Sequence, residues 1–447
     1  MRGFTVAQAA RICGGILNTA EGIDTPLGAI VIDSRAIQPG DVFAAYKGER
    51  VDGHAYISAA LDRGAACCLA ERVPEGETRP VIVVPDVQAA VETLAAAWRE
   101  ELRLPVIGVT GSVGKTSTKE MLAAVLAAQY SVLKTEGNLN NQIGVPMTVS
   151  RLEREHEAAV VELGISGFGE MTGLARIARP TIAVYTVIGH AHLEYLHDLE
   201  GVFRAKTEML PFLPADGAVV VNGDDPWLRS IACPQRLLRV GLGEENDLRA
   251  VDIRADERGT AFTLRFEGRE LPLRIPAYGQ HLIYAALEAA AVGLLLGMSD
   301  ARIAEGVGRF AIVGRRGAVT DTGSFTLIDD SYNANPDSVK CGLDSLAGLP
   351  GRQVAILGDM LEMGPESAAM HAEIGRYARE KGLALLLCAG TLGRYYAEGA
   401  GDIARYYETT EELIAALPAL LREGDAVLVK ASRGMRFERV AEAIKAL

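Results

Sequence analysis

The chain has 447 residues, of which 49% are hydrophobic and 23% are charged. These are ordinary globular values and exclude a disordered, collagen-like or fibrous chain, while the length predicts roughly two to four domains. The formal net charge of −13 argues against a general nucleic-acid binder, because duplex binding needs a basic face. We therefore expect no nucleic-acid partner, although a local basic pocket for an anionic metabolite is compatible with this charge.

The six cysteines include no C-x-x-C pair, and their spacing predicts neither a zinc site nor a disulfide framework. We interpret them as buried, reduced thiols of a cytoplasmic protein. The first residues lack a long apolar core and a cleavage-site pattern, which argues against a signal peptide. The apolar run 285–296 is short and contains Glu288, so we expect no membrane insertion and a cytoplasmic location.

The segment 1–103 mixes short strand-like runs with alanine-rich helical stretches. Strands are predicted at 29–32 and 81–84, and helices at 57–63 and 87–99. This mixture predicts a small mixed α/β domain at the N-terminal end.

From residue 104 onward, continuous apolar runs alternate with helical stretches, which predicts a parallel α/β sheet. The predicted strands are 106–109, 158–163, 182–187 and 218–221, and the predicted helices are 116–129 and 281–296. The segment 250–276 alternates and carries turn residues, which predicts antiparallel hairpins. We assign these elements to a central domain at 104–313.

After residue 313 the alternation of strands and helices starts again. Strands are predicted at 326–328, 353–357, 383–388 and 426–429, with helical stretches between them. The fold class is therefore predicted as α/β with three domains: a small mixed domain at 1–103, a P-loop-type parallel-sheet domain at 104–313 and a Rossmann-like domain at 314–447.

A glycine-rich loop lies between the predicted strand 106–109 and the predicted helix 116–129. Its glycines let successive N–H groups point at phosphate oxygens, and the helix adds its positive N-terminal end. Lys115 would reach the β- and γ-phosphates, and the Thr116 hydroxyl would ligate Mg²⁺. A turn with a solvated lysine is the alternative. The predicted ATP-binding residues of this loop are Gly111, Ser112, Val113, Gly114, Lys115, Thr116 and Ser117.

The usual P-loop has a glycine at the position of Val109, so the loop here is the shorter G-x-x-G-K-T. This shorter form is typical of the Mur ligase superfamily, which also includes folylpolyglutamate synthases, and the chain resembles that superfamily over essentially its whole length. Further matching segments are T-E-G-N-L-N-N at 135–141, E-L-G at 162–164, G-H-A-H-L-E at 189–194, A-K-T-E at 205–208 and N-G-D-D at 222–225. The resemblance implies ATP-dependent amide-bond formation through an acyl phosphate.

Within the superfamily, three segments resemble the members that add D-alanyl-D-alanine to UDP-N-acetylmuramoyl-tripeptide. They are 33–54, which begins D-S-R, the D-D-S-Y-N-A-N-P segment at 329–336, and the L-G-D-M-L-E-M-G segment at 357–364. The resemblance implies these two molecules as substrates, in peptidoglycan precursor synthesis. It also implies a UDP-sugar-binding first domain, an ATP-binding central domain and a third domain that contacts the amino substrate and the nucleotide. We expect a monomer.

Glu162 ends an apolar strand, where α/β sheets place ligand-facing groups, although a solvated carboxylate is the alternative. His190 and His192 could face the same way as a zinc pair, but the family pattern implies metal contact by His192, and we leave His190 as a structural histidine. Lys206 by itself would be read as a surface lysine.

The resemblance implies two Mg²⁺ ions and a carbamylated Lys206. A carbamate is an anion that can support a divalent metal site, whereas a bare ammonium would be repelled. The metal ligands implied in this way are Thr116, Glu162, His192 and Lys206, and the catalytic residues are Lys115, Glu162, His192 and Lys206.

Further substrate contacts are predicted in the first and third domains. Arg315, in a Gly-Arg motif, could reach phosphates, and Asp330 could accept hydrogen bonds from ribose hydroxyls. Ser34 and Arg35 resemble uridine-nucleotide contacts, although a loop arginine in an ion pair is the alternative. The resemblance also implies substrate contacts by Asn138, Asn333 and Asn335.

The predicted helix 281–296 departs from the family pattern. Relatives commonly have asparagine after the histidine and again three residues later, where this chain has Leu282 and Ala285. We therefore assign no adenine contacts. Two alternatives stay open: a paralogous Mur-type ligase for another carboxylate and amine, and an ATP-binding switch that clamps domains without ligase turnover.

Overall fold

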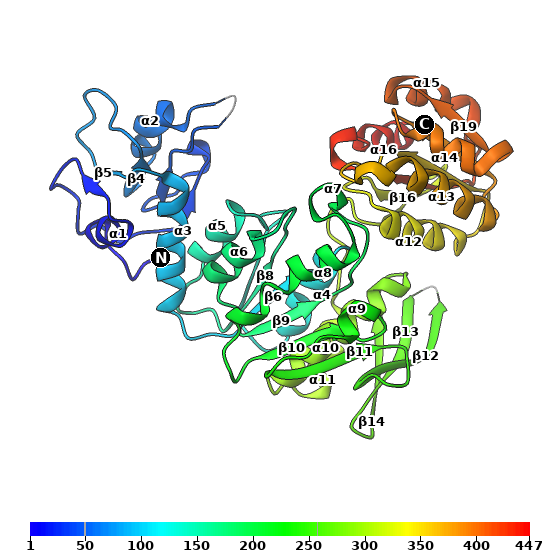
Figure 1. Ribbon diagram of the computed structural model, residues 1–447, viewed down its shortest axis with the longest axis horizontal. Helices are drawn as coiled ribbons and strands as arrows, with labels where there is room; N and C mark the ends of the chain where they lie inside the picture. Colours follow the sequence, from blue (N-terminus) through cyan, green and yellow to red (C-terminus); the bar gives the residue numbers. More distant parts are fainter. Residues whose placement is uncertain (49–50, 257) are drawn as a thin grey trace.

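The computed structural model describes residues 1–48, 51–256 and 258–447, and its strands form three sheets. The sheets lie in three separate bodies along the chain, as the blue, green and orange-to-red parts of Figure 1 show. This arrangement agrees with the predicted α/β class. Glu49 and Arg50, which belong to the quoted segment 33–54, lie outside the described residues.

The first sheet has the strand order β1-β5-β4-β3-β2, with β1 antiparallel to β5 and the other neighbours parallel. Its strands are β1 (Ile16–Leu17), β2 (Ile30–Val31), β3 (Val42–Ala44), β4 (Cys67–Ala70) and β5 (Val81–Val83). The helices of this part are α1 (Val6–Cys13), α2 (Ile57–Asp62) and α3 (Val87–Glu100).

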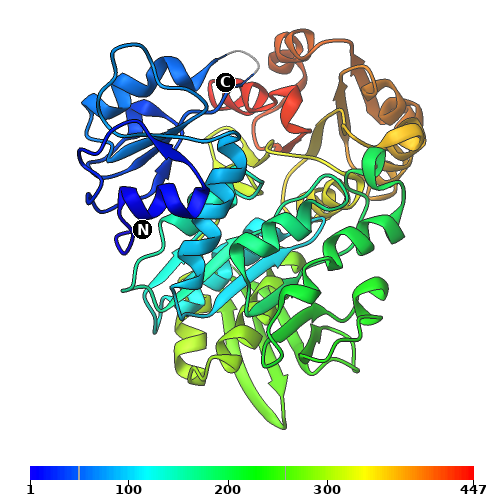
Figure 2. The ribbon, with the colours of Figure 1, turned by 60° about the vertical axis from the view of Figure 1, so that its left-hand side comes forward.

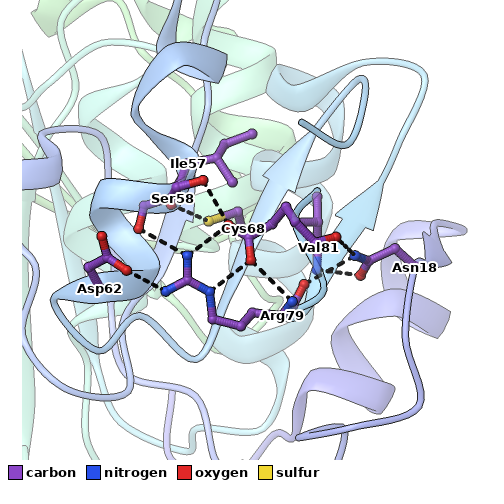
Figure 3. Close-up of polar contacts among 8 residues, drawn as sticks. Asn18, Ile57, Ser58, Asp62, Cys68, Arg79 and Val81 are labelled. Atoms are coloured by element: carbon purple, nitrogen blue, oxygen red, sulfur yellow. Dashed lines mark hydrogen bonds and ion pairs between the residues drawn. The ribbon is translucent and has the colours of Figure 1, made fainter. Parts of the chain in front are cut away.

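The segment between β4 and β5 is fixed by Arg79. Its guanidinium donates hydrogen bonds to Asp62 at 2.6 Å and to Glu77 at 2.7 Å, which ties the segment to α2 (Figure 3). The Asn18 amide oxygen accepts from the Val81 N–H at 2.8 Å on the other side. These contacts hold the first sheet together, and they include none of the predicted site residues.

The central sheet has the order β14-β13-β12-β11-β10-β9-β6-β8-β7. Its strands are β6 (Val106–Thr110), β7 (Val132–Lys134), β8 (Ala158–Glu162), β9 (Ile182–Tyr185), β10 (Ala218–Asn222), β11 (Arg236–Gly241), β12 (Leu248–Asp256), β13 (Gly259–Phe266) and β14 (Arg269–Ile275). The strands from β7 to β12 are parallel, and β12, β13 and β14 are antiparallel. The predicted hairpins at 250–276 are therefore confirmed.

Helices cover both faces of this sheet, because its strands are apolar on both sides. One buried core contains residues of α4 (Lys115–Leu126), α10 (Gln280–Leu295) and α11 (Asp300–Gly308). The opposite core contains residues of α5 (Gly144–Ser150), α6 (Glu170–Ala178) and α8 (Leu199–Thr207), and it continues into the first domain. The short helices α7 (Leu193–Leu196) and α9 (Pro226–Arg229) complete this part of the chain.

The third sheet has the order β15-β16-β20-β17-β18-β19, parallel except for β15. Its strands are β15 (Ala318–Asp321), β16 (Thr326–Asp330), β17 (Gln353–Gly358), β18 (Leu385–Ala389), β19 (Ala404–Tyr407) and β20 (Ala426–Lys430). The helices are α12 (Pro336–Ala347), α13 (Ser367–Glu380), α14 (Gly393–Ala400), α15 (Thr410–Leu420) and α16 (Glu438–Lys445). They cover the two faces of a Rossmann-like sheet, which is the yellow-to-red part of Figure 2.

All six cysteines are free; three are buried as predicted, whereas Cys13, Cys233 and Cys341 are half-buried. Among the described residues, none of the helices combines the length and the apolar character that a bilayer crossing requires. The boundaries near residues 103 and 313 stay predictions.

Candidate active site

The phosphate-type loop joins the end of β6 to the start of α4, so the predicted strand, loop and helix are confirmed. Gly111 has a φ of 153°, and a Cβ at this position would lie 1.9 Å from the Thr186 hydroxyl. Gly114 has a φ of 86° and forms the N-cap of α4. Glycine is needed at both positions, because one leaves no space for a side chain and the other requires left-handed backbone.

Lys115 folds back over this loop. Its ammonium donates hydrogen bonds to the carbonyl of Gly111 at 2.6 Å and to that of Ser112 at 3.4 Å. Burial lowers the pKa of Lys115 to about 8, and the nearby Glu162 carboxylate opposes this shift. The ammonium is therefore held beside the backbone amides that would surround a phosphate, and the solvated-lysine alternative is wrong.

Glu162 ends β8 and is fully buried. One carboxylate oxygen accepts a hydrogen bond from the Thr116 hydroxyl at 3.0 Å, and the other accepts from the Asn140 amide at 2.8 Å. The ammonium of Lys119 lies 3.6 Å from the same carboxylate. The solvated-carboxylate alternative is wrong, and Asn140 and Lys119 join the site although the sequence singled out neither as a ligand.

A cavity of about 380 Å³ lies between the central and third domains. It brings together predicted residues from both sides: Ser112, Val113, Gly114, Lys115, Thr116, Ser117, Glu162, His192, Asp330, Asn333 and Asn335. The phosphate loop thus faces the end of β16 and the start of α12, which come from a different domain.

The third-domain wall of the cavity is built on β16, β20 and α12. The Lys430 ammonium pairs with the Asp330 carboxylate and donates to the Asn333 carbonyl at 2.9 Å. The Asn335 side chain accepts from the Ser338 N–H at 2.8 Å and forms the N-cap of α12. This oxygen is therefore already used to cap the helix.

Six predicted residues do not line the cavity. Arg315 is held 3.1 Å from Glu442, and the neighbouring Arg316 lines the cavity instead. The Arg316 guanidinium lies 4.0 Å from the Tyr332 ring centroid. The two adjacent arginines lie in an irregular segment before β15, and no sequence signal tells which one faces the cavity. The other predicted residues outside the cavity lining are Gly111, Lys206, Asn138, Ser34 and Arg35.

Asn138 and the first-domain pair have local partners. The Asn138 carbonyl accepts from the Asn140 N–H at 2.8 Å, so it shapes the loop that presents Asn140 to Glu162. Ser34 and Arg35 lie in a short 3-10 helix (Ser34–Ala36). The exposed Arg35 guanidinium pairs with Asp33 at 2.7 Å, which is the ion-pair alternative named above.

Lys206 lies on α8 and is 1% exposed, so the surface-lysine interpretation is wrong. Burial, followed by repulsion from the Lys115 ammonium, lowers the pKa of Lys206 well below its ordinary value. The lysine lies outside the lining of the cavity, yet close enough to Lys115 for the two charges to interact.

The histidine loop before α7 contacts the third domain. His192 has a φ of 56°, and its Nδ1 lies 2.6 Å from the Glu362 carboxylate. The His190 ring lies 3.2 Å from Asp337. Within the described part of the chain, no group of three or more histidine, cysteine, aspartate or glutamate side chains is arranged to hold a metal ion.

Leu282 and Ala285 are 1% and 2% exposed and pack into the core beneath α10. The side chains that line the cavity at this helix are Tyr278, just before it, and His281. The departure from the family pattern therefore lies on the packed face of α10.

Comparisons with known proteins agree along the whole chain. Three family models match in order: the Mur ligase family catalytic domain at 27–101, the Mur ligase middle domain at 109–293, and the Mur ligase glutamate ligase domain at 308–433. The chain is 37% identical over 450 residues to the UDP-N-acetylmuramoyl-tripeptide–D-alanyl-D-alanine ligase of Bacillus subtilis, covering 98% of this chain and 97% of that protein.

Two crystal structures are also similar. The MurF structure from Acinetobacter baumannii has a TM-score of 0.89 and 30% identity, with 99% of each chain covered. The MurF ligase of Thermotoga maritima, solved in complex with ADP, has a TM-score of 0.83 and 29% identity, covering 94% of this chain and 97% of that one.

Proposed function

The chain belongs to the Mur ligase family, and from this premise we propose that it joins D-alanyl-D-alanine to UDP-N-acetylmuramoyl-tripeptide at the expense of ATP. The observation that carries the proposal is the cavity, in which the phosphate loop of one domain faces polar residues of another. An amide ligase needs this arrangement, because it must hold a nucleotide, a carboxylate and an amine together.

The proposed reaction has two steps. The terminal carboxylate of the tripeptide attacks the γ-phosphorus of ATP, which forms an acyl phosphate and releases ADP. The amine of D-alanyl-D-alanine then attacks the acyl carbon, and the tetrahedral intermediate collapses to the amide and inorganic phosphate. Lys115 and the loop N–H groups neutralise the charge of the transferred phosphoryl group, which is the principal contribution expected of the protein.

The Thr116 hydroxyl and the Glu162 carboxylate, 3.0 Å apart beside the phosphate loop, fit a Mg²⁺ ion. Mg²⁺ takes oxygen ligands and usually keeps several waters and substrate phosphates in its shell, so two protein oxygens suffice. When bound, the ion would neutralise phosphate charge. The His192 ring has only Nε2 available, because Nδ1 contacts Glu362. A second ion and metal contact by His192 are part of the proposal.

We also propose that Lys206 is carbamylated. Its depressed pKa favours the neutral amine, which is the form that reacts with CO₂ to give a carbamate and a proton. The product is an anion close to Lys115, and the positive charge of the Lys115 ammonium would stabilise it.

The remaining roles follow from the family assignment. The first domain, with Ser34 and Arg35, would hold the uridine end of the substrate, and Asn138, Asn333 and Asn335 would contact substrates. Arg316 and Asp330 would contact the nucleotide, with Arg315 outside the cavity in this arrangement of the domains. We also propose that the protein is a monomer and that it acts in the cytoplasm.

The test is ADP release measured with each substrate omitted in turn. The proposal expects release only when ATP, UDP-N-acetylmuramoyl-tripeptide and D-alanyl-D-alanine are all present. ADP release that requires a different amine would favour a paralogous ligase. ATP hydrolysis that proceeds at the same rate without the other two substrates would overturn the ligase assignment.

A further inference from the structure

The L-G-D-M-L-E-M-G segment at 357–364 belongs to the third domain, yet one of its residues contacts the central domain. The segment runs from the end of β17 into the loop before α13. Glu362 is exposed, and its carboxylate lies 2.6 Å from the Nδ1 atom of His192 across the domain interface. The proposed chemistry above gives this segment no role.

The contact involves the backbone as well as the side chain. The N–H of Glu194, at the start of α7, donates to the Glu362 carbonyl at 3.2 Å. Glu362 and His192 have φ angles of 62° and 56°, a left-handed conformation that is uncommon in residues other than glycine. Two partners that both hold strained backbone indicate that the surrounding structure fixes this contact.

A second contact also joins this histidine loop to the third domain. The His190 N–H donates to the Asp337 carboxylate at 2.7 Å, and Asp337 lies in the first turn of α12. Just before the loop in the sequence, the Ile188 N–H donates to the Asp225 carboxylate at 2.7 Å within the central domain. Figure 1 shows α7, which follows this loop, lying next to the third domain.

We infer that Glu362 is a positioning residue that sets the orientation of His192 only while the third domain is docked. An ionised carboxylate can only accept a hydrogen bond, so Nδ1 of His192 must carry the proton. Nε2 is then left as the acceptor of a ring that lines the cavity. Docking of the third domain would in this way complete the cavity on the central-domain side.

The first experiment is hydrogen exchange of the intact chain without substrates, compared between the parent and Glu362→Ala. We expect amide exchange of 190–197 to rise at least tenfold in the variant, because the side-chain contact between Glu362 and His192 is lost. Glu366→Ala is the matched control, since Glu366 is exposed two residues after the segment 357–364 and its side chain makes no hydrogen bond or ion pair among the described residues. This control should leave the exchange unchanged.

The second experiment is the ¹⁵N spectrum of histidine-labelled protein, with His192→Gln used to identify the His192 resonances. The parent should show a protonated Nδ1 and an unprotonated Nε2, and Glu362→Ala should show a mixture of both tautomers. A loss of packing alone would raise exchange without this change, so raised exchange with an unaltered tautomer overturns the inference, as does unaltered exchange.

If Glu362→Ala fails to fold, the same two measurements are made on Glu362→Asp. The shorter aspartate side chain cannot place its carboxylate 2.6 Å from the His192 ring. Both effects should then appear in the aspartate variant, and their absence overturns the inference. Neither measurement uses substrates, so failure here is distinguishable from failure of the ligase assignment.

Discussion

Lys115 is half-buried and Lys206 is buried, and desolvation lowers the pKa of both lysines. Lys115 keeps carbonyl partners within the phosphate loop. Lys206 makes no side-chain hydrogen bond or ion pair with any residue that the structure describes, and it faces a second positive charge. Their environments differ enough to expect different chemistry: charge neutralisation for Lys115 and covalent modification for Lys206.

Replacement of Lys115 by alanine should lower kcat at least 10²- to 10³-fold, about the loss seen when a group that stabilises transition-state charge is removed. The thermal midpoint should change little, because Lys115 is the first residue of α4 and contributes little apolar packing. ADP release and a melting curve measure the two effects. Lys381→Ala, at an exposed lysine of the third domain, is the control, and near-parent turnover of Lys115→Ala would contradict the phosphate-loop assignment.

Replacement of Lys206 by alanine should also remove most activity, but short carboxylates such as acetate should restore part of it. The added anion would occupy the space of the carbamate and supply its charge. Turnover is measured with and without acetate, with Lys115→Ala as a variant that acetate should not rescue. A Lys206→Ala enzyme as active as the parent would show that no carbamate is needed.

At the scale of elements, the phosphate-loop helix α4 packs against α10 through an acidic contact. The Thr118 hydroxyl donates to the Glu288 carboxyl group at 2.8 Å, and Glu288 is fully buried. Burial raises the pKa of Glu288 to about 8 from its ordinary value of 4.5. The folded protein therefore holds a proton that the unfolded chain has already released over this range of pH, so stability falls as pH rises through it.

Glu288→Gln should remove this pH dependence, because glutamine stays neutral. As pH is raised from 5 to 8, the variant should become more stable relative to the parent, and its thermal midpoint should rise relative to that of the parent. The difference in the free energy of unfolding should grow by up to roughly 1.4 kcal/mol for each pH unit. Melting curves at several pH values measure it, with Glu398→Gln at an exposed site as the control. A midpoint difference that is the same at pH 5 and pH 8 would show that Glu288 is ionised in the fold.

Long, uniformly apolar strands and the helices next to them could be predicted from the sequence, as β6, β8, β9, β10, α4 and α10 illustrate. Short elements could not: β1 has two residues and β7 has three, too few to establish a period. β4 reads C-C-L-A, and small residues of this kind carry no strand signal.

The residues of the candidate site could also be predicted only in part from the sequence. The phosphate loop is a local motif, so its residues and its place between a strand and a helix could be read directly. The partners of Glu162 and His192 could not, because they come from distant segments; His192 and Glu362 are 170 positions apart. Burial of Lys206 also depends on the packing of α8, which the lysine itself does not reveal.

At the scale of the molecule, the three bodies are not equally independent. The first domain shares a buried core with the central domain, and the Trp98 indole N–H donates to the Leu152 carbonyl at 2.9 Å across them. The third domain has its own two cores and meets the central domain around the cavity. We therefore expect the third domain to move relative to the central domain more readily than the first domain does.

Arg35→Ala should raise the KM for UDP-N-acetylmuramoyl-tripeptide and leave the KM for ATP unchanged. Loss of one charge-assisted hydrogen bond costs about 1.5–3 kcal/mol, or about 10- to 150-fold in binding. Because that contact is the same in the ground and transition states, kcat should change little. Each substrate is varied separately, with Arg63→Ala as an exposed first-domain control. A shift in the KM for ATP alone would show that the first domain does not bind the uridine end.

The central claim is that the tripeptide carboxylate is activated as an acyl phosphate, and oxygen transfer tests it most directly. The terminal carboxylate of UDP-N-acetylmuramoyl-tripeptide is labelled with ¹⁸O, and the released phosphate is analysed by mass spectrometry after reaction with ATP and D-alanyl-D-alanine. The mechanism predicts one ¹⁸O atom in each phosphate, because the carboxylate oxygen that attacks phosphorus leaves with it. Unlabelled phosphate would mean that water attacks ATP, and it would contradict the account.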